Sequence, residues 1–272
     1  MTEPSQACYM YCVLPAGETV ALEDVGGVAA GSRVTTLTHG ELRALVSEVD
    51  LEEFGEQALK RNLEDLGWLE RTARAHDAVL ARALAADAVV PMRLCTIFAN
   101  EGRAREMLAT EREVLLSALA RLRGRSEWSV KVLADHQTIE SLAQQRTPRM
   151  AEMAAGETES RGRAYFARKR QARTASEAAR ATVQTAVEDI HARLRERAAA
   201  AAVLTPQHPD VSGRRGHMVL NGAYLVDRSQ TQAFTALAEA SAEQYRPQGL
   251  ELELSGPWAP YNFVSVAQEP EW

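Results

Sequence analysis

The sequence predicts an α+β protein with two domains, over residues 1–123 and 124–272. A length of 272 residues is sufficient for two hydrophobic cores. Short apolar runs, typical of strands, are interleaved with longer segments whose apolar residues recur every three or four positions. Gly124 follows one of these helical patterns and marks the expected boundary.

The first domain is expected to contain a central strand, a hairpin and two long helices. Its strands are apolar runs bounded by Pro, Gly or polar turn residues. Its first helix carries leucines at three-and-four spacing and is expected to bend at Gly67. In this order the elements form a split βαβ-like unit. The predicted strands are Ala7–Leu14, Val34–Leu37, Leu42–Val49 and Ala88–Leu94, and the predicted helices are Glu56–Asp87 and Glu101–Arg123.

The second domain shows a similar order of elements. One candidate strand, Ala201–Val211, is weakened by two prolines. With it, the order becomes βαββαβ, which predicts a ferredoxin-like domain. The other expected elements are strands at Trp128–Leu133, Met218–Val226 and Leu250–Leu254, and a helix at Gln230–Tyr245.

A long helical segment, residues 147–202, lies within the second domain. Its apolar residues form a narrow stripe when each position advances by about 100°. Packing within the same chain is the favoured interpretation, and a coiled-coil seam is the alternative. The stripe consists of Tyr165, Ala172, Ala179, Val183, Val187, Ile190, Leu194 and Ala201.

The composition is that of an acidic globular protein. Hydrophobic residues make up 46% of the chain, and the net charge is −6, which disfavours binding of the whole protein to nucleic acid or to an anionic membrane. The sequence predicts no signal peptide and no membrane span, which needs ~20 apolar residues. Three cysteines without a dense pattern fit a reducing compartment, so we expect a cytoplasmic protein.

No catalytic motif of the GxSxG, GxGxxG or GxxxxGK[ST] type is present. Cys8 and Cys12 are four residues apart in an expected strand, about 13 Å, which is too far for a disulfide or a shared metal ion. His208, Asp210 and His217 are close in sequence, but their spacing matches no familiar metal site. We therefore predict no enzyme, no cofactor and no metal.

One segment is basic although the chain is acidic. Residues 161–197 hold ten Arg or Lys against four Asp or Glu, and RGRAYFARKR places Tyr165 and Phe166 among the cations. On a helix these cations spread around the circumference, whereas a helix that docks in a nucleic-acid groove gathers them. A solvated helix or a patch for an acidic protein is favoured. An RNA-binding ferredoxin-like module is the alternative function, but an RNP1-type stacking pattern is absent.

Near its end the chain reads GPWAPYNFV, residues 256–264. Pro257 and Pro260 cannot donate a ladder hydrogen bond, so strand pairing is expected to loosen there. Trp258, Tyr261 and Phe263 provide large apolar surfaces, which favour a role in covering the edge of the core. A partner-binding aromatic patch is the alternative.

Several blocks of this sequence resemble the gas vesicle protein F/L family. LSGPWAPYNFV, with NGAYLVDR ahead of it, is similar to the C-terminal signature of that family. The other blocks follow in family order, and together they span nearly the whole chain. These blocks are YCVLP, LRALVSEVD, AHDAVLARAL followed by VVPMRLCTIF, and GRAYFARKR.

The chain departs from the family pattern at three positions. Ala259 stands where a second proline is expected, and Met92 and Cys95 replace an expected leucine and glycine. We therefore do not expect these positions to be functionally strict.

The resemblance implies a non-catalytic accessory or minor structural protein of gas vesicle formation. Gas vesicles are hollow shells of a small, very hydrophobic protein, which family members are expected to bind together with other accessory vesicle proteins. The implied fold has two α+β domains, the C-terminal one ferredoxin-like. The type, F or L, and retention in the finished vesicle stay open.

Two surfaces are candidates for contact with the shell protein. The apolar face of a shell subunit must stay covered until assembly, and an α+β scaffold can cover it with a sheet edge or an apolar groove. One candidate is the helix stripe, which could also serve a homo-oligomer, and the other is the aromatic ending. The candidate residues are Tyr165, Val183, Val187, Ile190, Leu194, Trp258, Tyr261 and Phe263.

Overall fold

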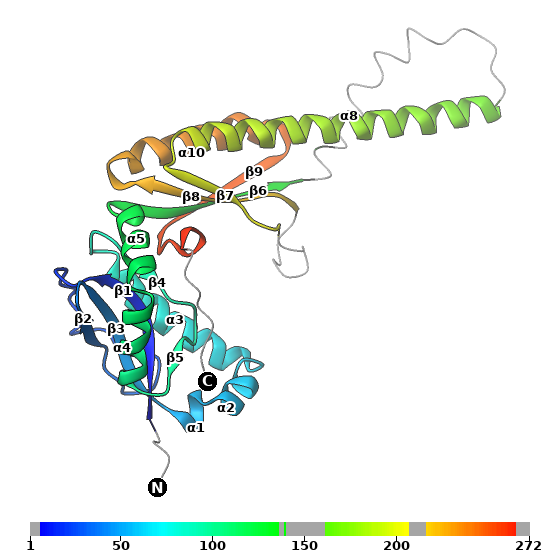
Figure 1. Ribbon diagram of the computed structural model, residues 1–272. Coiled ribbons are helices and arrows are strands. Elements are labelled where there is room, and N and C mark those ends of the chain that lie inside the picture. Colours follow the sequence, from blue (N-terminus) through cyan, green and yellow to red (C-terminus); the bar gives the residue numbers. More distant parts are fainter. Residues whose placement is uncertain (1–5, 136–138, 140–160, 207–215, 265–272) are drawn as a thin grey trace. The chain divides into compact units, whose positions relative to one another are not determined.

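The computed structural model describes residues 6–135, 139, 161–206 and 216–264, and it is a mixed helix and antiparallel-sheet protein (Figure 1). Its contacts divide the chain into two compact units, Met1–Glu127 with Pro257–Trp272, and Trp128–Gly256. We had expected a second domain that continues from residue 124 to residue 272. The difference arises because Ala259, after the last strand, packs into the hydrophobic core of the first unit.

The first unit contains a five-stranded sheet of order β2-β3-β1-β4, with β5 also paired to β1. β1 is antiparallel to both β3 and β4, so those two strands are parallel to each other and flank it. They are joined through helices, which is the split βαβ arrangement. The strands are β1 (Gln6–Pro15), β2 (Thr35–His39), β3 (Leu42–Asp50), β4 (Val90–Pro91) and β5 (Ile97–Phe98).

The helices of the first unit are shorter than the sequence pattern predicted. The expected helix at Glu56–Asp87 does not bend at Gly67 but is interrupted before it, because Asp65 accepts hydrogen bonds from the N–H groups of Gly67 (2.8 Å) and Trp68 (3.2 Å) and starts a new helix. The expected helix at Glu101–Arg123 likewise divides at Glu111. The observed helices are α1 (Leu51–Phe54), α2 (Glu56–Asn62), α3 (Leu66–Ala83), α4 (Glu101–Thr110) and α5 (Arg112–Leu122).

The central strand β1 is buried on both faces, from Ala7 to Leu14. Tyr9 and Tyr11 belong to the core that contains the buried residues of α3. Alternate residues of a strand point to opposite faces, so Cys8 faces the other side, where α4 also contacts β1. Burial raises the pKa of the Cys8 thiol to about 12, and Glu101 of α4 adds to this shift.

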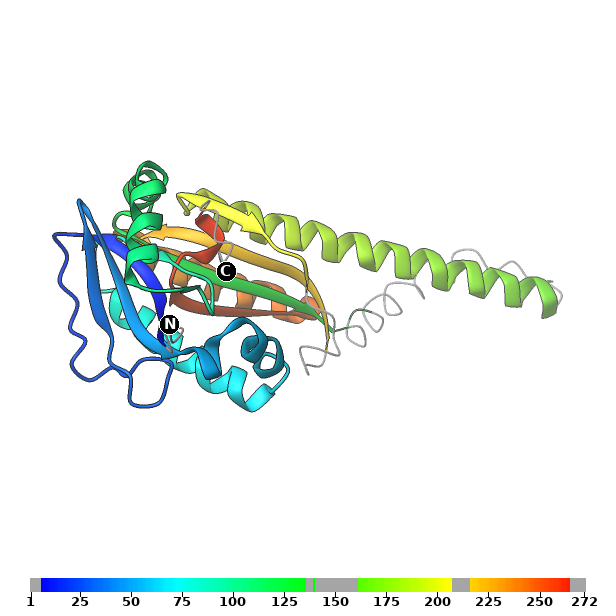
Figure 2. The same ribbon diagram turned by 60° about the horizontal axis from the view of Figure 1, so that its bottom comes forward.

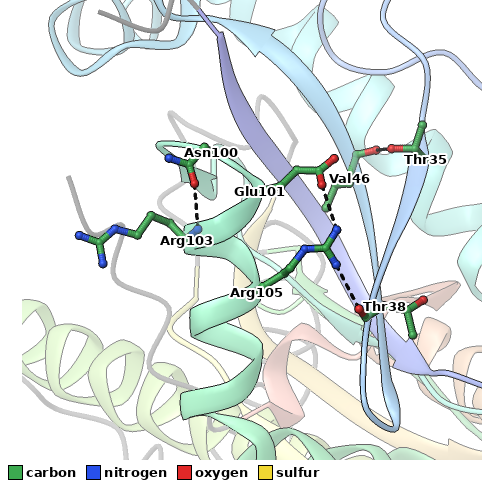
Figure 3. Close-up of polar contacts among 7 residues, drawn as sticks. All are labelled: Thr35, Thr38, Val46, Asn100, Glu101, Arg103 and Arg105. Carbon is green, nitrogen blue, oxygen red and sulfur yellow. Dashed lines mark hydrogen bonds and ion pairs between the residues drawn. The ribbon is translucent and has the colours of Figure 1, made fainter.

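The edge strand β2 is tied to α4 by charged and polar side chains (Figure 3). The Arg105 guanidinium donates to the carbonyl of Thr38 (3.2 Å) and to the carboxylate of Glu101 (3.1 Å). Asn100 begins α4 by accepting the N–H of Arg103 at 3.0 Å. A charged group against an edge strand discourages pairing with a further strand.

The second unit contains a four-stranded sheet of order β7-β8-β6-β9, whose one face carries both long helices (Figure 1). β7 ends at Val203, and residues 207–211 of the expected strand Ala201–Val211 lie outside the described residues. β9 is longer than expected because it continues through Pro257. β9 is an edge strand, where the missing N–H of a proline is tolerated. The elements are β6 (Arg125–Ala134), α8 (Arg161–Glu196), β7 (Ala200–Val203), β8 (His217–Asp227), α10 (Thr231–Tyr245) and β9 (Leu250–Trp258).

Helix α8 packs on this sheet and on α10 through its C-terminal half. Ile190 and Leu194 are fully buried there beside Phe234 of α10. Two hydrogen bonds also join α8 to the end of α10, from Tyr245 Oη to Asp189 (2.6 Å) and from Arg193 to Gln244 (2.9 Å). The N-terminal half of α8 extends beyond the sheet in both views (Figures 1 and 2).

Candidate interaction surface

The last residue of β9 and the segment that follows it present aromatic rings at the surface of the first unit. Ala259 and Pro260 are buried, and a 3-10 helix, η3 (Tyr261–Phe263), follows them. The side chain of Trp258 is 49% exposed and that of Tyr261 is 38% exposed. A buried proline and alanine between two exposed rings hold the backbone close to the core while the rings remain accessible.

A buried carboxylate fixes one side of η3. Glu127 accepts hydrogen bonds from the backbone N–H of Asn262 (3.0 Å) and from its side-chain Nδ2 (2.6 Å). Burial raises the pKa of the Glu127 carboxyl, and the two hydrogen bonds from Asn262 partly oppose that shift. Arg121 of α5 donates to the carbonyl of Phe263 at 2.6 Å.

A buried histidine fixes the other side of η3. Nε2 of His76, on α3, lies 2.9 Å from the hydroxyl of Tyr261, and its Nδ1 lies 2.9 Å from the hydroxyl of Tyr9. Burial lowers the pKa of His76 to about 4, although a hydrogen bond with the Met92 backbone opposes that shift. The imidazole is therefore neutral at pH 7, and each of its nitrogens has a tyrosine hydroxyl as a partner.

The chain of hydrogen bonds continues to a residue with an unusual backbone. The N–H of Cys95 donates to the hydroxyl of Tyr9 at 3.0 Å, and Cys95 has a φ angle of +62°. This left-handed region favours glycine, because a side chain there clashes with the backbone. Burial raises the pKa of the Cys95 thiol to about 11, so the thiol is protonated at neutral pH.

Aromatic rings surround the histidine inside the core. The ring centroids of Tyr11 and His76 are 5.5 Å apart. Those of Tyr9 and Phe54 are 6.1 Å apart, in an edge-to-face contact. Phe54 in turn contacts Trp68 at 5.4 Å. This packing holds His76 in position for Tyr261, which makes the orientation of the surface segment depend on the core.

The predicted candidate residues lie in two different environments. Trp258 and Tyr261 are exposed, and Phe263 is half-buried. Val187, Ile190 and Leu194 are buried in the core of the second unit and Val183 is packed against it, in agreement with the favoured interpretation of the stripe as packing within the chain. The side chain of Tyr165 lies outside the described residues.

The sequence pattern missed the buried residues of this site. His76 and Glu127 have partners that are 185 and 135 positions away. The available signal was the position of His76 on α3, where it falls on the face that also carries Thr72, Val79 and Ala83, all buried. A histidine on an apolar helix face predicts burial and a specific hydrogen-bond partner.

In the part of the chain that the structure describes, no group of three or more His, Cys, Asp or Glu side chains is placed to hold a metal ion. His208 and Asp210, which are close to His217 in the sequence, lie outside that part. Among the described helices, none combines the length and the apolar character that crossing a membrane requires.

Comparison with known proteins gives a consistent result. Residues 7–265 match the family described as gas vesicle synthesis protein GvpL/GvpF. The chain is 36% identical to gas vesicle protein L of Streptomyces sp. (strain CB03234), over 96% of this chain and 94% of that protein. It is 26% identical to gas vesicle protein F of the same strain, over 94% and 98% of the two chains.

A solved structure shares the fold. The crystal structure of gas vesicle protein GvpF from Anabaena sp. PCC7120 superposes with a TM-score of 0.67 and 18% identity, and it covers 97% of this chain and 98% of that one.

Proposed function

The chain belongs to the GvpL/GvpF family of gas vesicle synthesis proteins, and from this membership we propose that it binds the small hydrophobic shell protein during vesicle assembly. Family membership indicates a role in gas vesicle formation. The proposed role is that of a non-catalytic accessory or minor structural protein, which keeps the apolar face of the shell subunit covered until assembly. It would act in the cytoplasm, at the growing vesicle, together with other vesicle proteins.

The observation that carries the proposal is the fixed aromatic surface at Trp258 and Tyr261. Large aromatic side chains dominate the binding energy of protein interfaces when they are held rigidly, because little conformational entropy is lost on binding. Here the rings are half-exposed, while Glu127 and His76 hold the backbone and the Tyr261 hydroxyl between them. A surface of this kind fits an apolar partner.

We also propose that the chain has two domains and that the second is ferredoxin-like. The element order β6-α8-β7-β8-α10-β9 and the sheet order β7-β8-β6-β9 support this topology. Membership in the L-type branch is proposed as well, because identity to the L protein of the Streptomyces strain is 36% and identity to its F protein is 26%.

Co-expression with the shell protein tests the proposed function. The tagged chain would be captured at ~0.15 M and ~0.5 M NaCl, because an apolar contact resists salt whereas a contact between exposed charges is screened. We expect the shell protein to remain soluble and to be captured at both concentrations. Trp258→Ala should reduce capture at least about tenfold, as expected for a buried aromatic contact.

A matched control is Val114→Ala, which removes another exposed apolar side chain of the first unit. It should leave capture unchanged. If the shell protein were captured at neither salt concentration, the proposed contact would be overturned. Another vesicle protein would then be the direct partner. Equal effects of the two substitutions would remove Trp258 from the interface.

A further inference from the structure

The N-terminal half of α8 carries all of the excess positive charge of that helix. Residues 161–182, here named the basic arm, contain seven Arg or Lys and one Glu, whereas residues 183–197 contain three of each sign. The residues of α8 that pack on the sheet and on α10 lie between Ala179 and Leu194. The packed part therefore begins near the C-terminal end of the basic arm, and the rest of the arm extends beyond the sheet (Figure 2).

Three cations of the basic arm lie along one line of the helix. Lys169, Arg173 and Arg180 are exposed, and they are four and seven residues apart. With about 100° per residue, they fall within about 40° of one another. Arg173 has an ion pair with Glu177 at 2.9 Å, but both side chains are more than half exposed, so that pair is weak and can exchange partners.

The first unit carries a surface of opposite charge. Residues 50–70, here named the acidic corner, contain seven Asp or Glu against two Lys or Arg. They form α1, α2 and the first turns of α3. At the junction of α2 and α3, the side chain of Leu66 is 80% exposed and that of Leu63 is 46% exposed.

The exposed leucines distinguish this corner from an ordinary solvated acidic surface. Leu63 ends α2 and Asp65 caps α3, so two residues separate the leucines and the tight connection turns both side chains outward. Glu64 and Glu70 are exposed on either side of Leu66. An apolar centre with a charged rim is the usual plan of a protein interface.

We propose that the basic arm of one copy of this chain binds the acidic corner of a second copy. The charges are complementary, and the aliphatic stems of arginine and lysine can cover the two leucines while their charged ends reach the acidic rim. A nucleic acid would bind the basic arm, but its binding would not account for the acidic corner and the exposed leucines there. A helix that extends into solvent is only marginally stable by itself, so docking would also stabilise the arm.

The two surfaces differ, so the contact is heterologous. Each copy that uses its arm still offers its corner to a further copy, and such contacts form rings or linear chains rather than a closed symmetric pair. These surfaces are separate from the segment at Trp258. A negative result for the proposed contact with the shell protein would therefore not affect this inference, and the reverse is also true.

Sedimentation velocity of the full chain tests the inference. At ~0.05 M NaCl we expect species larger than the monomer that grow with protein concentration, and at ~0.5 M NaCl we expect the monomer. An arm variant, Arg173→Glu with Arg180→Glu, and a corner variant, Glu64→Lys with Glu70→Lys, should each weaken association at least about tenfold at low salt. All four positions are exposed, so circular dichroism should show intact folds.

Mixing the two variants provides the decisive measurement. The natural arm of the corner variant meets the natural corner of the arm variant, and the two reversed surfaces also match each other, so association should return in strictly alternating complexes. Arg195→Glu, an exposed change on the packed half of α8, is the matched control and should associate like the natural chain.

Three outcomes would overturn the inference. The natural chain could remain a monomer at ~0.05 M NaCl and about 100 μM protein, where a weak interface already forms oligomers. The mixture of variants could fail to associate. Finally, a single-stranded RNA oligonucleotide could bind the natural chain and not the arm variant without any self-association, which would assign the arm to nucleic acid.

Discussion

Nε2 of His76 lies 2.9 Å from the hydroxyl oxygen of Tyr261, although the two residues are 185 positions apart. This hydrogen bond connects a half-exposed ring to an imidazole that is almost completely buried. On its other side the imidazole contacts Tyr9 in the central strand. The orientation of the proposed contact surface therefore depends on a polar group inside the core.

Removing the Tyr261 hydroxyl should destabilise the protein. In Tyr261→Phe, one buried nitrogen of His76 loses its tyrosine partner, which typically costs about 1–3 kcal/mol. Urea unfolding monitored by tryptophan fluorescence would measure the change in the free energy of unfolding. Val114→Ala, at an exposed position, should change that free energy by less than about 0.5 kcal/mol.

The depressed pKa of His76 predicts acid sensitivity. Burial lowers this pKa from 6.5 to about 4, so between those values the unfolded chain binds a proton that the folded chain does not. The free energy of unfolding should therefore fall as the pH falls from about 6.5 to 4, by at most about 3 kcal/mol from this residue. The stability is fully present above pH 6.5.

Comparison with His76→Gln isolates that contribution. The raised pKa of Glu127 acts in the opposite sense, because the folded state holds its proton more tightly, and this effect is common to both proteins. The difference in stability between the natural chain and the variant should shrink on acidification. Parallel pH profiles for the two proteins would show that His76 does not titrate in this way.

Much of the fold could be predicted because local pattern and tertiary packing agree. The uninterrupted apolar run of β1 is buried on both faces, and the stripe of α8 from Val183 to Leu194 lies against the second core. The interruption at Asp65 was missed because leucines continue at helical spacing across it. The Asp65 side chain caps two backbone N–H groups and starts a new helix there, which the periodicity does not reveal.

The site was only half predictable for a different reason. The sequence identified Trp258 and Tyr261 as large apolar side chains in a proline-containing ending, but it favoured a role in covering the edge of the core and gave an exposed patch only as the alternative. The groups that hold them, His76 and Glu127, come from α3 and β6 and meet the ending only in the folded chain. Sequence spacing carries no information about partners so far apart.

The backbone at Cys95 predicts a stabilising substitution. At a φ of +62°, a residue with a side chain is strained by about 1 kcal/mol relative to glycine. Cys95→Ala and Cys95→Gly both remove the thiol, and only the second relieves the strain. We expect the glycine variant to be more stable than the alanine variant by about 1 kcal/mol, measured by thermal unfolding. The reverse order would indicate that local packing outweighs the strain.

We expect Asn262 to position the exposed rings of Trp258 and Tyr261 without contacting the shell protein itself. Its side chain donates to the buried carboxylate of Glu127 at 2.6 Å, so Asn262→Ala removes one of the two hydrogen bonds that Asn262 makes there. The loss should cost about 1–3 kcal/mol and loosen η3. Hydrogen exchange at residues 258–264 should accelerate, and capture of the shell protein should weaken although Trp258 and Tyr261 are unchanged. Unaltered exchange would mean that the remaining contacts, from His76, Arg121 and the Asn262 backbone N–H, are sufficient to hold the segment. Weaker capture together with unaltered exchange would place Asn262 itself in the interface.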